Sequence, residues 1–132
     1  MTGEELTQNY PLAKIAIENY FRQLILNEIA DNSEETTFIH SIERWGVPDK
    51  MLYDLIDTNA HALFEMFDSH GVYIVISIAA TDPETIISFN CSIYIKDYGT
   101  VIIGAGFLNR EEAERAGIEK AFKMLNDHLS QD

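Results

Sequence analysis

Cysteine, proline and basic residues are scarce in this chain, and long apolar runs are missing. The single cysteine, Cys91, cannot form an internal disulfide. No apolar stretch reaches the roughly 20 residues that a membrane-spanning helix needs. Residues 1–5 carry acids where a secretory signal peptide carries bases. These absences predict a cytoplasmic protein.

The shortage of bases leaves a strongly acidic chain. The sequence holds 9 lysines and arginines against 22 aspartates and glutamates, for a net charge of −13. Thirteen of the acids lie in residues 1–69, against four bases, so this half alone carries −9. Such a field repels nucleic acids and anionic membranes and favours basic partners. A purely solubilising role of the charge is the alternative explanation.

Two alternating patterns near the C-terminal end predict a β-hairpin. Apolar residues occupy every second position from 87 to 95 and again from 101 to 107, which is the period of a half-buried strand. The tripeptide 97–99 ends in Gly99, which supplies the positive φ of a tight turn. A β-branched apolar run at residues 72–80 predicts a preceding third strand.

A long helix is predicted over residues 110–129. Asn109 can cap it, and Glu112 stands where a capping box places its acid. Gly117 costs about 1 kcal/mol of helix propensity against alanine, so we expect it to allow close packing on the sheet. The predicted centre of the core between sheet and helix consists of Phe89, Ile93, Phe107, Phe122 and Leu125.

The sequence pattern of the N-terminal half predicts helices. Apolar residues recur at helical spacing over residues 11–30, 33–46 and 48–69, and residues 58–59 could bend or divide the last of these helices. Residues 1–10 are polar, and we expect them to be loose at the start. The chain is therefore predicted to be an α+β protein. We expect N-terminal helices followed by a three-stranded antiparallel sheet, with a long C-terminal helix packed on it. We predict a single domain over 1–132, with an acidic helical region at 1–69 and a βββα region at 70–132.

The C-terminal half resembles the double-stranded RNA-binding domain. The matching positions are the small residues 104–106, the helix start at 109–114, and Ala116, Gly117 and Ala121. The resemblance implies an α-β-β-β-α fold over residues 59–129. The family has a serine and three lysines at this helix start, whereas this chain keeps only Arg110 and has Glu111 and Glu114 instead. The chain as a whole also resembles small proteins of bacterial phages and mobile elements.

Residues that could carry chemistry are few, and each has a simpler explanation. His40 and Glu43 stand three apart on a predicted helix, as a proton-transfer pair or half a metal site would, but such residues usually lie on a solvated face. Cys91 falls on the apolar face of its strand, where a thiol acts as a small hydrophobe. Gly104 and Gly106 lie inside a strand pattern, not in a phosphate-binding turn. We therefore predict no enzyme activity, no cofactor and no metal.

One face of the predicted sheet is too apolar for open water and too polar for a core. We expect either the N-terminal helices or another chain to cover it. The candidate interaction surface consists of Tyr73, Val75, Tyr94, Ile102, Gly104 and Gly106.

Three functions are compatible with these patterns. The first is a non-enzymatic protein–protein interaction module or homodimer that uses the sheet face. The second is an acidic mimic of DNA that inhibits a nucleic-acid-binding protein, with a carboxylate stripe of Glu28, Asp31, Glu34, Glu35 and Glu43. The third is a degenerate double-stranded RNA-binding domain. The charge favours a protein partner or self-association over nucleic acid or a membrane.

Overall fold

A computed structural model describes residues 1–29, 36–79 and 87–131 of the chain. It confirms the predicted α+β class, with helices followed by an antiparallel sheet and a long final helix. The chain forms two compact units, residues 1–59 and residues 60–132. The second unit begins ten residues before the βββα region that was predicted to start at residue 70. The single-domain assignment stays a prediction. Among the described residues, no helix has both the length and the apolarity to cross a membrane.

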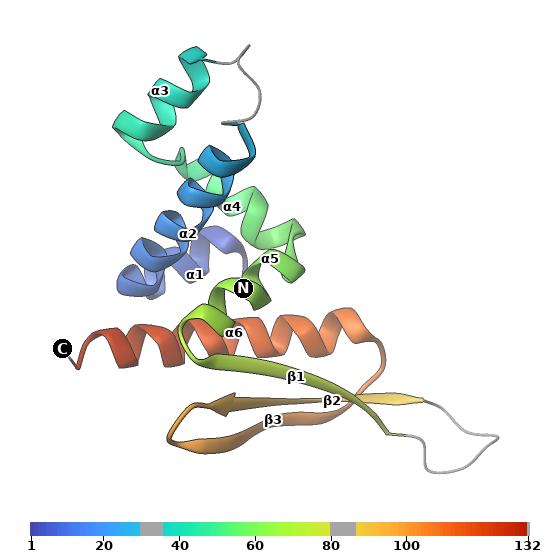
Figure 1. Cartoon of the computed structure of the whole chain (residues 1–132). Helices are drawn as coiled ribbons and strands as arrows, with labels where there is room; N and C mark the ends of the chain where they lie inside the picture. Colours follow the sequence, from blue (N-terminus) through green and yellow to red (C-terminus); the bar gives the residue numbers. More distant parts are fainter. Residues whose placement is uncertain (30–35, 80–86, 132) are drawn as a thin grey trace. The chain divides into compact units, whose positions relative to one another are not determined.

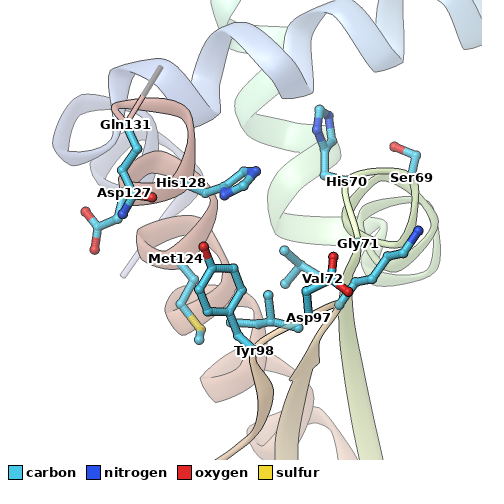
Figure 2. A pocket seen from close by; sticks show the side chains of 12 residues that line it. Ser69, His70, Gly71, Val72, Asp97, Tyr98, Met124, Asp127, His128 and Gln131 are labelled. Atoms are coloured by element: carbon cyan, nitrogen blue, oxygen red, sulfur yellow. The ribbon is translucent and has the colours of Figure 1, made fainter.

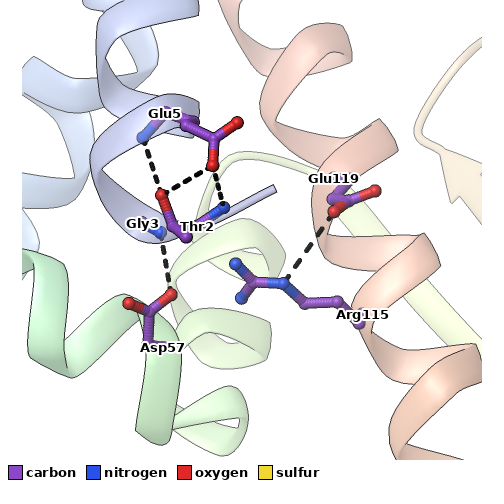
Figure 3. Close-up of polar contacts among 6 residues, drawn as sticks. All are labelled: Thr2, Gly3, Glu5, Asp57, Arg115 and Glu119. Carbon is purple, nitrogen blue, oxygen red and sulfur yellow. Dashed lines mark hydrogen bonds and ion pairs between the residues drawn. The ribbon is translucent and has the colours of Figure 1, made fainter.

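Helices build the first unit. They are α1 (Gly3–Asn9), α2 (Pro11–Ile29), α3 (Thr36–Trp45) and α4 (Asp49–Thr58). The expectation of a loose N-terminus was wrong, because residues 3–9 are helical. Thr2 and Glu5 form a reciprocal capping box, in which each side chain accepts a hydrogen bond from the backbone N–H of the other residue (Figure 3). The Gly3 N–H donates to Asp57 Oδ1 at 2.7 Å, which ties α1 to α4.

A polar contact joins α2 to the link between α3 and α4. The Glu18 carboxylate accepts a hydrogen bond from the Val47 N–H at 2.9 Å and pairs with Arg22 at 3.3 Å. Gly46 ends α3 with a φ of +80°, a conformation that favours glycine. A Cβ there would also lie against the Glu18 and Arg22 side chains. Gly46 therefore lets the chain turn directly over this ion pair.

The second unit has the order α-β-β-β-α. Its elements are α5 (Ala60–Ser69), β1 (Val72–Ala79), β2 (Ser88–Ile95), β3 (Gly99–Phe107) and α6 (Arg110–Leu129). The strands follow one another in an antiparallel sheet of order β1-β2-β3, as predicted. The segment predicted as a helix over 48–69 is divided at Asn59, because α4 ends at Thr58 and α5 begins at Ala60.

Helix α6 lies along one face of the sheet (Figure 1). Asn109 caps it by accepting a hydrogen bond from the Glu112 N–H at 2.8 Å, and Arg115 pairs with Glu119 along the helix (Figure 3). A Cβ at Gly117 would stand only 2.7 Å from Ile74 Cγ2 and 2.8 Å from Cys91 Sγ. Glycine at this position is therefore required by the close approach of the helix to β1 and β2, as predicted.

The core of the second unit centres on the middle of α6. Phe122, Leu125 and Ile93 are fully buried, as predicted. Phe122 meets Phe67 of α5 edge-on, with ring centroids 5.7 Å apart. The prediction was wrong for Phe89 and Phe107, which are only half-buried. They pair with each other at the far end of β2 and β3, where the register shifts, and so lie at the margin of the core.

Truncation of Phe122, the central aromatic residue, should destabilise the second unit. Phe122→Ala removes a ring that is completely buried, and such truncations cost about 3–5 kcal/mol because the cavity collapses only in part. We expect a clearly lower unfolding midpoint in chemical denaturation followed by circular dichroism. Lys123→Ala, its exposed neighbour, should leave the midpoint within the range of ordinary surface substitutions. Equal midpoints for the two variants would contradict this core.

Candidate functional site

The three strands contain no charged residue, although the chain as a whole is rich in acids. Two neighbouring rows cross the side of the sheet opposite α6. The first row is Tyr73, Tyr94 and Thr100, and the second is Val75, Ser92 and Ile102. The two tyrosine rings lie 6.1 Å apart, centroid to centroid. Four of the six predicted surface residues are thus brought together, and this side is called the outer face below.

The bulky residues of the outer face are open to solvent. Ile102 is 80% exposed, Val75 46%, Tyr94 45% and Tyr73 38%. Within the second unit, α6 packs on the opposite side, against Ile74 and Cys91, and Phe67 of α5 joins it there. The described helices of this unit therefore leave the outer face bare.

The two glycines of the predicted surface do not behave alike. Gly104 pairs with Cys91, which is buried under α6, so it lies on the helix side and was wrongly assigned to the outer face. The irregular register between β2 and β3 causes this change of side. The Phe107 ring covers Gly104, because a Cβ would stand 2.9 Å from it. Gly106 has a φ of +77° and donates its N–H to Asn90 Oδ1, an outer-face residue, at 3.3 Å.

The histidines considered for chemistry lie on exposed helix surfaces, and the cysteine lies in the core. His40 and Glu43 are 3.8 Å apart on an exposed side of α3, and His61 pairs with Glu65 on an exposed side of α5. Cys91 is buried, and burial raises the pKa of its thiol, which disfavours the reactive thiolate. In the part of the chain that the structure describes, no three His, Cys, Asp or Glu side chains are placed to hold a metal ion.

The carboxylate stripe proposed for DNA mimicry is described only in part. Glu28 in α2 and Glu43 in α3 are exposed. Asp31, Glu34 and Glu35 lie outside the described residues, so the stripe as a whole stays a prediction.

A pocket of about 840 Å³ lies at one end of the second unit (Figure 2). It is formed where α5 runs into β1, where the β2–β3 turn begins, and by the last turns of α6. His70 and His128 face each other from opposite sides, and the Tyr98 hydroxyl is directed toward His128. The lining residues are Ser69, His70, Gly71, Val72, Ile95, Lys96, Asp97, Tyr98, Met124, Asp127, His128 and Gln131.

The surroundings of the pocket change the proton affinity of one histidine. Partial burial is the main cause that lowers the pKa of His70, and repulsion from His128 adds to it. Both effects disfavour the imidazolium, so His70 is neutral over more of the pH range than a free histidine. A neutral imidazole offers one nitrogen as a hydrogen-bond acceptor.

No pattern in the sequence indicates this pocket. His70 and His128 are far apart in the chain, and each follows or ends a helix without any motif around it. Their one shared signal is position, since both lie at the C-terminal ends of predicted helices. Pairing them requires knowing that α5 and α6 end on the same side of the sheet.

No protein-family model, curated protein or solved structure matches this chain.

The His70 environment predicts a measurable titration. By NMR, the His70 imidazole should titrate below its ordinary value of about 6.5, and His128→Gln should raise it by removing one of the two causes. The unfolded state takes up this proton at the higher pH, so the His70 contribution to stability is fully present above the ordinary pKa and is lost as the pH falls from that value through the lower pKa of the folded state. Titration of His70 at or above its ordinary value would contradict this environment.

Proposed function

We propose that this protein is a non-enzymatic interaction module that self-associates through the outer face of its sheet. The observation that carries the proposal is an exposed, charge-free sheet face on a chain of net charge −13. Exposed apolar patches rimmed by polar residues mark interaction surfaces. Two copies of so acidic a chain repel each other, and an uncharged face is the surface on which they approach at least cost.

The layout of the outer face supports a second copy as the occupant. Its two bulky rows, which contain Tyr73, Tyr94, Val75 and Ile102, occupy one half. The other half holds small residues, Ser77 opposite Asn90 and Ala79 opposite Ser88. In a two-fold dimer the bulky half of each copy packs over the small half of the other, because a two-fold interface is self-complementary. Aligned face-to-face packing of two sheets has this geometry.

The size of the face sets the strength of the association. Three strands about 4.8 Å apart and eight residues long at about 3.4 Å each give a face of roughly 14 by 27 Å. This falls short of the about 800 Å² per partner that a standard stable interface buries. We therefore expect a dimer that forms reversibly as the protein concentration rises, not an obligate one.

A charge placed on the outer face should abolish the dimer. Ile102→Lys buries an ammonium group in the interface of each copy, which costs far more than it does in the free chain, where β3 is an exposed edge strand that tolerates lysine. We expect dimerisation to weaken by about tenfold or more. Sedimentation velocity over a concentration series measures this change.

Leu108→Lys is the matched control, because Leu108 is also exposed but follows β3 and lies off the face. It adds the same charge and should leave the association unchanged. A wild-type chain that stays monomeric at every concentration would contradict the proposal, and so would equal behaviour of the two lysine variants.

RNA binding is the third of the candidate functions, and we propose that this chain lacks it. The order of elements in the second unit is compatible with the resemblance to the double-stranded RNA-binding domain. At the start of α6, however, Arg110 pairs with Glu114 at 2.9 Å. The first turn also holds Glu111 and Glu112, which already satisfy the positive end of the helix dipole.

We expect no measurable affinity of the wild-type protein for double-stranded RNA or DNA at physiological salt. Affinity for phosphate grows with the number of basic contacts, so even Glu111→Lys with Glu114→Lys should give at most weak, strongly salt-dependent binding. An electrophoretic gel-shift assay with both proteins measures this. Tight binding by the wild type would place the RNA-binding hypothesis first.

A further inference from the structure

The pocket at the end of the second unit has no part in the proposed self-association. It lies where α5, the β2–β3 turn and the end of α6 converge, and the residues of the outer face do not line it. Its lining combines three apolar side chains, those of Val72, Ile95 and Met124, with polar and charged residues that are called the polar rim below. A concave site with an apolar base and a few converging polar groups is the usual form of a small-molecule site.

The backbone around the pocket favours positive charge. Ser69, the last residue of α5, lines it, and so do residues of the last two turns of α6. The C-terminal end of a helix carries a partial negative charge from its free carbonyl groups. Two such ends meet at this site, whereas the N-termini of α5 and α6, which would attract anions, do not line it.

The rim also offers more acceptors than fixed positive charges. Asp97 and Asp127 supply carboxylates, and Lys96 is the one lysine or arginine in the lining. Asp127 pairs with Lys123 at 3.2 Å, which leaves Asp97 as the stronger attractor. The facing imidazoles of His70 and His128 add acceptor nitrogens when they are neutral (Figure 2).

The same residues argue against two other ligand classes. A metal ion needs at least three suitable side chains at bonding geometry, and the described part of the chain brings no such group together. Binding of an anion would require both histidines to be protonated or would depend on Lys96 alone. It would also be opposed by the two helix ends and by the net charge of −13.

We infer that this pocket binds a small organic cation, namely a protonated primary amine on an aromatic or other apolar body. The ammonium group donates to the Asp97 carboxylate and the acceptors of the rim. The apolar body lies on Met124 and Val72, beside the Tyr98 ring, whose face also attracts a cation.

Three probes that differ only in their polar group test this inference. They are 2-phenylethylamine, 2-phenylethanol and phenylacetate, added to the full chain labelled with ¹⁵N and observed by NMR. We expect the amine to shift the amide signals of Gly71, Asp97 and His128, the alcohol to shift them less, and phenylacetate to leave them unchanged. Binding of phenylacetate as tight as that of the amine would overturn the inference, and so would an absence of shifts with all three probes.

A pair of isosteric variants separates the pocket from the general attraction of an acidic chain. Asp97→Asn removes one carboxylate but keeps a residue type that tolerates the left-handed φ of +74° found there. It should weaken binding of the amine by about tenfold, the loss of one charge-assisted hydrogen bond. Asp54→Asn changes the net charge equally at an exposed position in α4 and should have no effect. An equal loss in both variants would reduce the binding to non-specific electrostatics and overturn the inference.

Discussion

The fold of the second unit depends on the closeness of α6 to a sheet that carries no charge. Gly117 permits this approach, because any side chain there would collide with Ile74 and Cys91. Closeness lets Phe122 reach Phe67 and close the core over β2. The other side of the sheet exposes Tyr73, Val75, Tyr94 and Ile102, and such an apolar patch is more stable when it is covered. Helix α6 covers one side of the sheet, and the proposed self-association would cover the other side.

The charged residues of the chain are placed away from the outer face of the sheet. The three strands hold no acid, and most acids of the chain belong to the described helices. Surface charge of one sign keeps copies apart in general, and it restricts their contact to the place from which it is excluded. In the proposed dimer, the acids that disfavour phosphate at the start of α6 would also orient the two copies. The proposed cation site depends on the same excess of negative charge, because an acidic surface with two helix C-termini favours a cation.

Periodicity predicted the elements that bury one side against a single partner. The alternation in β2, the run in β1 and the helical stripe of α6 each identify their buried side without knowledge of the rest. The errors came from features that periodicity does not encode. The Thr2–Glu5 capping box was present in the sequence as a spacing and was overlooked. The shifted register in β3 moved Gly104 to the other side, and the His70–His128 pair depends on distant segments meeting.

An intermolecular nuclear Overhauser effect in a sample that mixes labelled and unlabelled chains tests the central claim directly. In one chain Ile102 and Ala79 lie two strands and four residues apart on the outer face, roughly 16 Å from strand spacing and rise, too far for transfer between their methyl groups. In the dimer the bulky half of one copy covers the small half of the other. We therefore expect a cross peak between the Ile102 methyl of one chain and the Ala79 methyl of the second. Cross peaks between chains that involve only residues 1–59 would contradict it.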